Sequence, residues 1–338
     1  MEFRNKFLKD IGVVLKAREV DIEDELTQCY NYNQEIEVLL KTKVILNKKQ
    51  CVNICQPLGR VIKVFEVLRA CSNGRSEYEV LFCEFQYTIL KIYKLIKACA
   101  QEQWYEVSIF QMENKEMFRE LLWDLKTCHD VGIDQLSKKC PKMMEVITPI
   151  LFDVSTYEEV KRDSEELFKR LDHKSKDTQF KDHDLVNYLS TRLTNLWYVE
   201  DGEMDFLEVS SDIKSLELGR IINEGAFGKV YESKWFGLAI ATKIMDASWN
   251  DMFIKEIGIL AITSHPNLIK YYYAAKSDAN RNGESPTLNY SREKVYLVME
   301  LMQTSLSNIL EAKRAMPYYF LIDVIYQIAR GMCYLHDM

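Results

Sequence analysis

The chain has 338 residues, 47% of them hydrophobic and 28% charged, with a formal net charge of −7 and a pI near 5.5. Because a single hydrophobic core rarely serves more than about 250–300 residues, we expect two domains. The acidic balance excludes the strong basic excess of most nucleic-acid-binding proteins, so no nucleic-acid partner is expected. No uncharged apolar run reaches the length of about 18 residues that a membrane span needs, and residues 1–10 do not form a signal peptide.

The nine cysteines predict no disulfide framework. Their number is odd, no Cys-x-x-Cys occurs, and most lie within apolar helical patterns, which is typical of reduced thiols in a cytoplasmic protein. Cys51 and Cys55 would share one helix face and could hold half of a metal site. No partnering Cys or His pair lies nearby in the sequence, so packing is the favoured interpretation and no metal is expected.

Residues 1–150 predict an all-α domain. Their apolar residues recur at helical spacing, alternating strand patterns are absent, and glycine is scarce. The segment 77–100 is apolar around most of its circumference, as the central helix of a bundle should be. We therefore expect a four-helix-type bundle, or one slightly larger, whose predicted helices lie at residues 35–56, 60–71, 77–100 and 117–128.

Residues 151–212 are predicted to connect this bundle to a second domain. Ser155 and Glu158 form a capping-box signature that opens a helix to about residue 171. A second helix follows near residues 185–197, and an acidic linker closes the segment.

The pattern changes to short β runs in residues 213–338. Five runs combine β-branched and aromatic residues, with one helix at residues 250–262 between the third and fourth. Two helices, at residues 305–314 and 318–337, follow the last run. The whole chain is therefore expected to be α+β, with a helical bundle followed by a five-stranded antiparallel sheet. The predicted strands are residues 216–223, 229–235, 238–243, 268–275 and 295–300.

A series of motifs begins at residues 223–230, which read Asn-Glu-Gly-Ala-Phe-Gly-Lys-Val. Gly225 and Gly228 lack Cβ atoms, so their backbone can approach nucleotide phosphates closely. Residues 240–243 follow as Ile-Ala-Thr-Lys, and Glu256 lies in the next predicted helix. Alone, Lys243 is more simply a solvated strand lysine and Glu256 an exposed helix residue.

Three further motifs follow at spacings that resemble a protein kinase. They are His265-Pro266-Asn267, the strand 295–300 reading Val-Tyr-Leu-Val-Met-Glu, and residues 331–336 reading Gly-Met-Cys-Tyr-Leu-His. Together these motifs identify residues 213–338 as similar to the first part of a protein kinase domain, comprising the N-lobe, the hinge and the first C-lobe helices.

The resemblance implies an ATP site. Lys243 would meet the α- and β-phosphates and form an ion pair with Glu256, beneath the loop that contains Gly225 and Gly228. Asn223 departs from the family's first glycine, and Asn tolerates left-handed turns better than other residues that carry a Cβ.

The same resemblance places the adenine ring. Val230 and Ala241 would sandwich the ring, and Met299 would be the gatekeeper beside it. The backbone of Glu300 and Met302 would hydrogen-bond the adenine edge. On its own, Met299 is ordinary core.

The family's catalytic loop and Asp-Phe-Gly element have no match in this sequence. Residues 336–338 read His-Asp-Met, which is not the catalytic loop. We therefore expect a truncated kinase domain with no catalytic residue in this chain, and Mg²⁺ binding only with the missing C-lobe. Phosphoryl transfer to Ser/Thr is expected only of a full-length protein, so whether this chain is an enzyme stays open.

Trp235-Phe236-Gly237 favours the tyrosine-kinase-like branch of Ser/Thr kinases. A bundle joined to such a lobe also resembles the plant relatives of the mixed lineage kinase domain-like proteins, which act in plant immunity. The alternative function is thus a pseudokinase-type switch, in which the bundle forms a homo-oligomer or makes peripheral membrane contact in immune cell death. Residues 1–150 hold 22 Lys and Arg against 22 Asp and Glu, so no basic bias favours a membrane-associated location.

Overall fold

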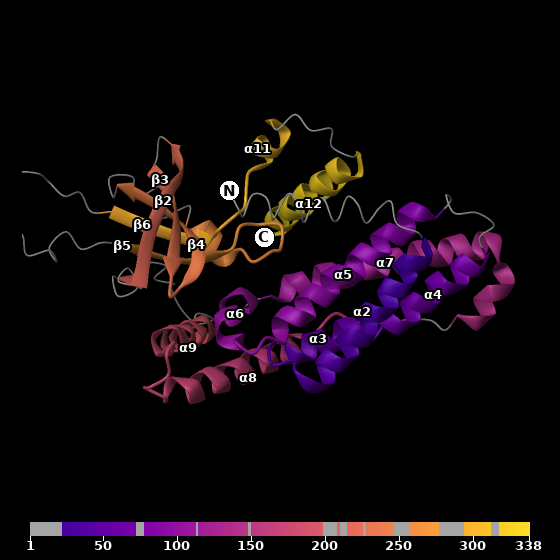
Figure 1. Cartoon of the computed structure of the whole chain (residues 1–338), viewed down its shortest axis with the longest axis horizontal. Helices are drawn as coiled ribbons and strands as arrows, with labels where there is room; N and C mark the ends of the chain where they lie inside the picture. The colour runs from indigo at the N-terminus through magenta and orange to yellow at the C-terminus, as the bar shows by residue number, and fades with distance from the viewer. Residues whose placement is uncertain are drawn as a thin grey trace, which may run out of the picture. The chain divides into compact units, whose positions relative to one another are not determined.

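The computed structural model describes residues 22–71, 78–112, 114–147, 150–198, 208–209, 215–225, 228–246, 257–276, 294–311 and 318–338. The chain divides into two compact units, Met1–Thr194 and Asn195–Met338. The predicted α+β class is confirmed: the first unit is helical, and the second contains the sheet (Figure 1).

The described residues of the first unit form helices joined by short connections, and the last of these helices continues past the boundary at Thr194. They are α2 (Ile22–Thr42), α3 (Lys48–Cys55), α4 (Leu58–Cys71), α5 (Glu79–Cys99), α6 (Trp104–Gln111), α7 (Lys115–Lys139), the 3-10 helix η2 (Pro141–Val146), α8 (Tyr157–Ser175) and α9 (His183–Tyr198). The sequence pattern missed α6 and η2 and made α7 too short.

Four long helices form the predicted bundle. α2 packs against α4 and α5, and α7 packs against the same two helices (Figure 1). Aromatic rings fill the core: Phe65 of α4 stacks on Phe85 of α5 with ring centroids 3.8 Å apart, and meets Phe82 edge-on at 5.3 Å. Gly132 allows α7 to pack closely against α4, since a Cβ at residue 132 would lie 3.3 Å from Val64 Cγ1.

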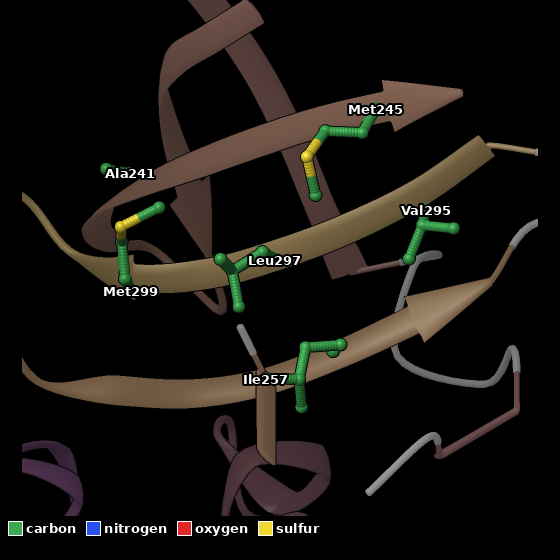
Figure 2. Close-up of a cluster of buried hydrophobic side chains, with 7 residues drawn as sticks. Ala241, Met245, Ile257, Val295, Leu297 and Met299 are labelled. Atoms are coloured by element: carbon green, nitrogen blue, oxygen red, sulfur yellow. The ribbon is translucent and has the colours of Figure 1, made fainter. Parts of the chain in front are cut away.

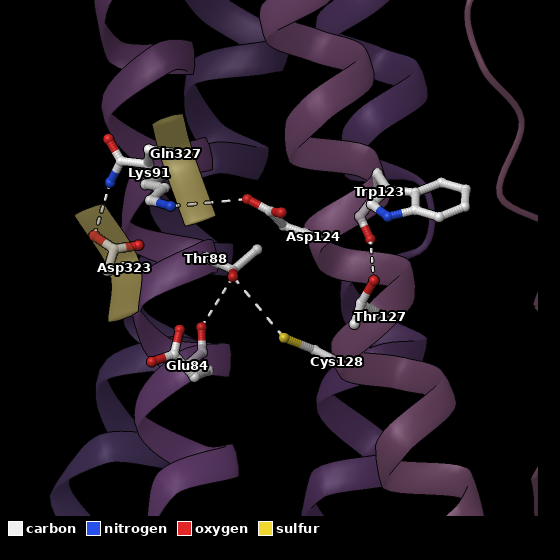
Figure 3. A network of polar contacts seen from close by, with 9 residues as sticks. All are labelled: Glu84, Thr88, Lys91, Trp123, Asp124, Thr127, Cys128, Asp323 and Gln327. Atoms are coloured by element: carbon white, nitrogen blue, oxygen red, sulfur yellow. Dashed lines mark hydrogen bonds and ion pairs between the residues drawn. The ribbon is translucent and has the colours of Figure 1, made fainter. Parts of the chain in front are cut away.

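Polar contacts accompany the apolar packing where α5 meets α7 (Figure 3). The buried Thr88 hydroxyl donates to the Glu84 carbonyl at 2.9 Å and lies 3.9 Å from Cys128 Sγ. Nearer the surface, Lys91 Nζ lies 3.7 Å from the Asp124 carboxylate. These contacts satisfy polar groups within a seam that is otherwise hydrophobic.

The single helix predicted over residues 35–56 is wrong, because the structure divides it into α2 and α3. Val44 and Leu46 in the break are buried, so the apolar pattern continues although the helix does not. The N–H groups of Ile45 and Leu46 donate to the Cys99 carbonyl at 3.0 and 3.1 Å, and Asn47 adopts a left-handed conformation (φ 49°). A tertiary contact with the end of α5 thus replaces the helical hydrogen bonds.

The capping box of α8 lies one residue later than predicted. Thr156, not Ser155, is the N-cap: the Glu159 N–H donates to Thr156 Oγ1 at 3.3 Å, and the Thr156 N–H donates to the Glu159 carboxylate at 2.9 Å. These hydrogen bonds lower the pKa of Glu159. The Ser155 hydroxyl instead accepts from Asn53 Nδ2 of α3 at 3.2 Å.

Asp163 fastens α8 to α3. Its carboxylate accepts the N–H groups of Lys49 and Gln50 at 2.9 and 3.1 Å, and no side chain within α3 caps that end. Asp163 therefore supplies the cap from another helix. Burial raises the pKa of Asp163 despite these donors. Folding therefore favours the protonated form, so the contribution of Asp163 to stability is greatest at acid pH and is lost as the pH rises through the folded-state pKa.

We predict that Asp163→Ala destabilises the first unit by about 2 kcal/mol, because it leaves two backbone N–H groups at the start of α3 without their acceptor. Hydrogen exchange at Lys49 and Gln50 should accelerate accordingly. Glu166→Ala is the matched control on α8, since Glu166 lies in an exposed ion pair with Arg170. Equal protection of both amides in the two variants would contradict the cap.

The second unit contains the predicted five-stranded antiparallel sheet. It consists of β2 (Leu216–Gly225), β3 (Gly228–Trp235), β4 (Leu238–Asp246), β5 (Tyr271–Lys276) and β6 (Lys294–Glu300), and the strand order is β5-β6-β4-β3-β2. A short strand, β1 (Glu208–Val209), adds a parallel edge beside β5 that the sequence pattern did not predict. Phe236 and Gly237 turn the chain between β3 and β4, both with positive φ.

Helices complete the described part of this unit. Residues 257–262 are helical, and the earlier part of the predicted helix 250–262 lies outside the described residues. α11 (Leu306–Glu311) and α12 (Tyr318–Asp337) follow the sheet. α12 agrees with its predicted bounds and carries several exposed apolar side chains, among them Ile322, Ile325, Ile328 and Met332.

Candidate nucleotide site

The hairpin between β2 and β3 contains the predicted glycine-rich loop. Asn223 pairs with Val230 and Gly225 with Gly228, while residues 226–227 at the tip lie outside the described residues. Gly228 has a φ of +146°, and a Cβ there would lie 2.3 Å from the Ile244 carbonyl oxygen of β4. Close contact with β4 therefore requires glycine at residue 228, whereas Gly225 has open space around it.

A cross-strand ion pair braces the same hairpin. Lys229 Nζ lies 2.9 Å from the Glu224 carboxylate on the opposite strand, and this hydrogen bond raises the pKa of Lys229. Both side chains are exposed, so we assign the pair a role in strand pairing and no large contribution to stability.

The strand register gathers four predicted site residues on one face of the sheet. Ala241 of β4 pairs with Met299 of β6, and Lys243 pairs with Val230 of β3 on one side and with Leu297 of β6 on the other. Directly paired residues in an antiparallel sheet point to the same face, and every second residue along a strand does so too. Val230, Ala241, Lys243 and Met299 therefore share a face.

Ala241 and Met299 belong to a buried hydrophobic cluster (Figure 2). Figure 2 shows Met245, Leu297 and Met299 from neighbouring strands above Ile257, which is the first described residue of the following helix. Val230 is partly buried and packs against the cluster. The cluster is formed by Ala241, Met245, Ile257, Ala274, Val295, Leu297 and Met299.

The predicted partner of Lys243 lies outside the described residues. Lys243 is half-buried on β4, and Glu256 is not described. The residue that follows it, Ile257, is 1% exposed and packs into the cluster on the face that carries Lys243. The ion pair between Lys243 and Glu256 stays a prediction.

Glu300, the predicted hinge residue, is fixed by Lys270. The Glu300 N–H donates to the Lys270 carbonyl at 2.9 Å, and the Glu300 carboxylate accepts the Lys270 N–H at 2.6 Å. A backbone contact from Glu300 to a ligand would therefore use its carbonyl oxygen. Met302, the other predicted hinge residue, has an exposed side chain, and the intervening Leu301 packs against the cluster.

Two other kinase-like motifs meet in the structure. The His265 ring stacks on Tyr334 of α12 with centroids 4.9 Å apart, and the Tyr334 hydroxyl accepts the Ser264 N–H at 3.1 Å. A Cβ at Gly331 would lie 3.1 Å from the Asn267 carbonyl oxygen. The His-Pro-Asn turn thus rests on the helix segment that carries the last motif, a contact that sequence reasoning did not predict.

The opposite face of the sheet is also buried. Trp235 is fully buried and lies 5.0 Å from Tyr273 and 6.3 Å from Tyr272 by ring centroids. Thr242, on the same face, is buried as well. The Trp-Phe-Gly motif therefore contributes to packing as well as to the turn, which the sequence pattern alone did not indicate.

Neither a metal centre nor a membrane span is present in the described ranges. They contain no group of three or more His, Cys, Asp or Glu side chains that could hold a metal ion. None of their helices is both long and apolar enough to cross a membrane.

Protein kinases bind nucleotide on an antiparallel sheet that has a glycine-rich hairpin. The sheet also carries a lysine on its nucleotide-binding face and is followed by a helix. Comparison with known proteins agrees, since residues 216–338 match the protein kinase domain. These residues are therefore similar in sequence to a protein kinase domain, and protein kinase domains in general use ATP and Mg²⁺.

Relatives include both serine/threonine and tyrosine kinases. Human mitogen-activated protein kinase kinase kinase 7 is 31% identical over 140 residues, covering 40% of this chain and 20% of that protein. The Dictyostelium discoideum seven transmembrane domain-containing tyrosine-protein kinase 1 is 32% identical over 139 residues, covering 36% and 17%. The chain spans about a fifth or less of the length of the curated relatives it matches.

The two glycines of the hairpin should respond differently to substitution. We predict that Gly228→Ala destabilises the second unit by about 2–4 kcal/mol, because the new methyl group meets the Ile244 carbonyl and the backbone is strained. Gly225→Ala, the matched control, should cost less than about 1 kcal/mol. Urea unfolding with hydrogen exchange at β3 and β4 measures both, and equal losses would refute the close approach.

Proposed function

We propose that residues 216–338 bind ATP on the face of the sheet that carries Val230, Ala241, Lys243 and Met299. The observation that supports this proposal is the strand register, which pairs Ala241 with Met299 and Val230 with Lys243. It puts a small side chain, a branched apolar one and a cation on one surface beneath a glycine hairpin. Adenine needs flat apolar walls, and phosphates need positive charge and close backbone, which this surface combines.

Each residue has a distinct part in this proposal. Val230 and Ala241 contact the two faces of the adenine ring, and Met299 limits the depth of the site. The carbonyl of Glu300 and the backbone of Met302 bond the adenine edge. Lys243 meets the α- and β-phosphates and is held by Glu256, while Gly225 and Gly228 let the hairpin cover the phosphates.

We propose that the protein transfers phosphoryl groups to Ser or Thr where its chain includes the family's catalytic loop and metal-binding carboxylates. The support is the kinase-domain match and the serine/threonine kinases among the relatives. Bound Mg²⁺ would neutralise charge on the phosphates during transfer.

Calorimetric titration of the chain with ATP, with and without Mg²⁺, tests the nucleotide site. We predict that Lys243→Met weakens binding about 10–100-fold, as expected for the loss of a charge-assisted contact to phosphate. Lys234→Met is the matched control, because Lys234 is an exposed lysine of the neighbouring strand β3. Absence of ATP uptake by the unsubstituted chain in both buffers would refute the proposal.

The finer resemblance, to plant mixed lineage kinase domain-like proteins, remains a prediction with its own test. Lys41, Lys43, Lys48 and Lys49 are all exposed, around the break between α2 and α3. If the bundle acts on membranes, the chain should release dye from vesicles containing anionic lipid, and replacing these four lysines by glutamine should reduce the release. Vesicles that stay intact would count against membrane action.

A further inference from the structure

The edge strand β2 departs from regular pairing with β3 beside Glu232. Two residues of β2, Gly219 and Arg220, lie opposite Glu232 alone, because the register shifts between Leu218 and Ile221. This two-against-one arrangement is a β-bulge, an irregularity that redirects a side chain. A Cβ at Gly219 would lie 2.6 Å from the Glu232 carbonyl oxygen, so glycine is required for β2 to approach β3 this closely.

Arg220 and Glu232 form an ion pair across this bulge. Arg220 Nε donates to the Glu232 carboxylate at 2.5 Å. The two side chains are 76% and 40% exposed, so the pair adds little to the stability of the sheet. Its main physical effect is therefore to cancel a negative charge at this point of β3.

Glu232 lies on the face of the sheet proposed for the nucleotide. It pairs directly with Ala241 of β4, and it is the second residue after Val230 along β3. Directly paired residues, and every second residue of a strand, point to the same face. Glu232 therefore shares a face with Lys243, and a carboxylate there without a cation beside it would repel the phosphates of a nucleotide.

We propose that Arg220 neutralises Glu232 and thereby lets this face accept a nucleotide that carries phosphates. This role rests on the ATP site proposed above. The ion pair has no net charge, so ATP approaches Lys243 without repulsion from β3. Adenosine carries no phosphate, and its binding does not depend on the pair. Arg220 thus acts through Glu232, and the two residues set the preference of the site for a charged nucleotide over a neutral nucleoside.

The test is calorimetric titration of the full chain with ATP and, separately, with adenosine. At low ionic strength Arg220→Gln should weaken ATP binding about two- to five-fold and leave adenosine binding unchanged. Glu232→Gln should strengthen ATP binding by a similar factor, and the double variant should regain the affinity of the unsubstituted chain. These differences should disappear at about 1 M salt, where the Debye length is about 3 Å.

Arg330→Gln is the matched control, because it removes the same side chain from α12, outside the sheet, and it should change ATP affinity less than Arg220→Gln does. The role of the pair is overturned if Arg220→Gln weakens ATP and adenosine alike, as a purely structural contact between β2 and β3 would. It is also overturned if Glu232→Gln weakens ATP binding, or if the variants and the unsubstituted chain bind ATP equally at low salt. An unsubstituted chain that binds neither ligand would instead refute the ATP site itself, and the role of the pair with it.

Discussion

The pairing register of β3, β4 and β6 is the constraint on which the candidate site depends. Because successive residues of a strand point to opposite faces, a shift of one position would turn Lys243 onto the face occupied by Trp235 and Thr242. Gly228 leaves no room for a Cβ against the Ile244 carbonyl of β4, and Glu300 at the end of β6 is bonded twice to Lys270, the residue before β5. The residues that resemble a nucleotide site thus take their positions from backbone geometry that ordinary hydrogen bonding enforces.

The helical unit is organised by a related principle, in which polar groups at irregular positions find partners on other helices. The N–H groups in the break after α2 are satisfied by the end of α5, and those at the start of α3 by Asp163 of α8. Such bonds matter because a buried backbone donor without an acceptor costs about 1–3 kcal/mol. The apolar cores of the bundle hold the helices together, while these polar contacts determine where the helices begin and how α8 docks.

The kinase-like motifs acquire a physical explanation once the second unit is folded. His265 stacks on Tyr334, and Gly331 leaves space for the Asn267 carbonyl. The His-Pro-Asn motif and the motif of α12, some 65 residues apart in the sequence, are therefore packed against each other. Met299 and Ala241 belong to a hydrophobic cluster that also includes Ile257. Met299 and Ala241 therefore belong both to the candidate site and to the hydrophobic core of the second unit. Substitutions of these two residues will alter the stability of the unit as well as nucleotide binding.

The amino-acid sequence by itself determined the α+β class, the bundle, the order of the five strands along the chain and the kinase resemblance of residues 216–338. These follow from residue periodicity, glycine placement and motif spacing, all of which are local or depend only on order. Tertiary structure alone decided the break before α3, the one-residue shift of the α8 cap and the β1 edge. Each of these depends on an acceptor or neighbour from a distant segment. A buried break such as residues 43–47 carries the same apolar pattern as a helix, so the pattern cannot reveal it.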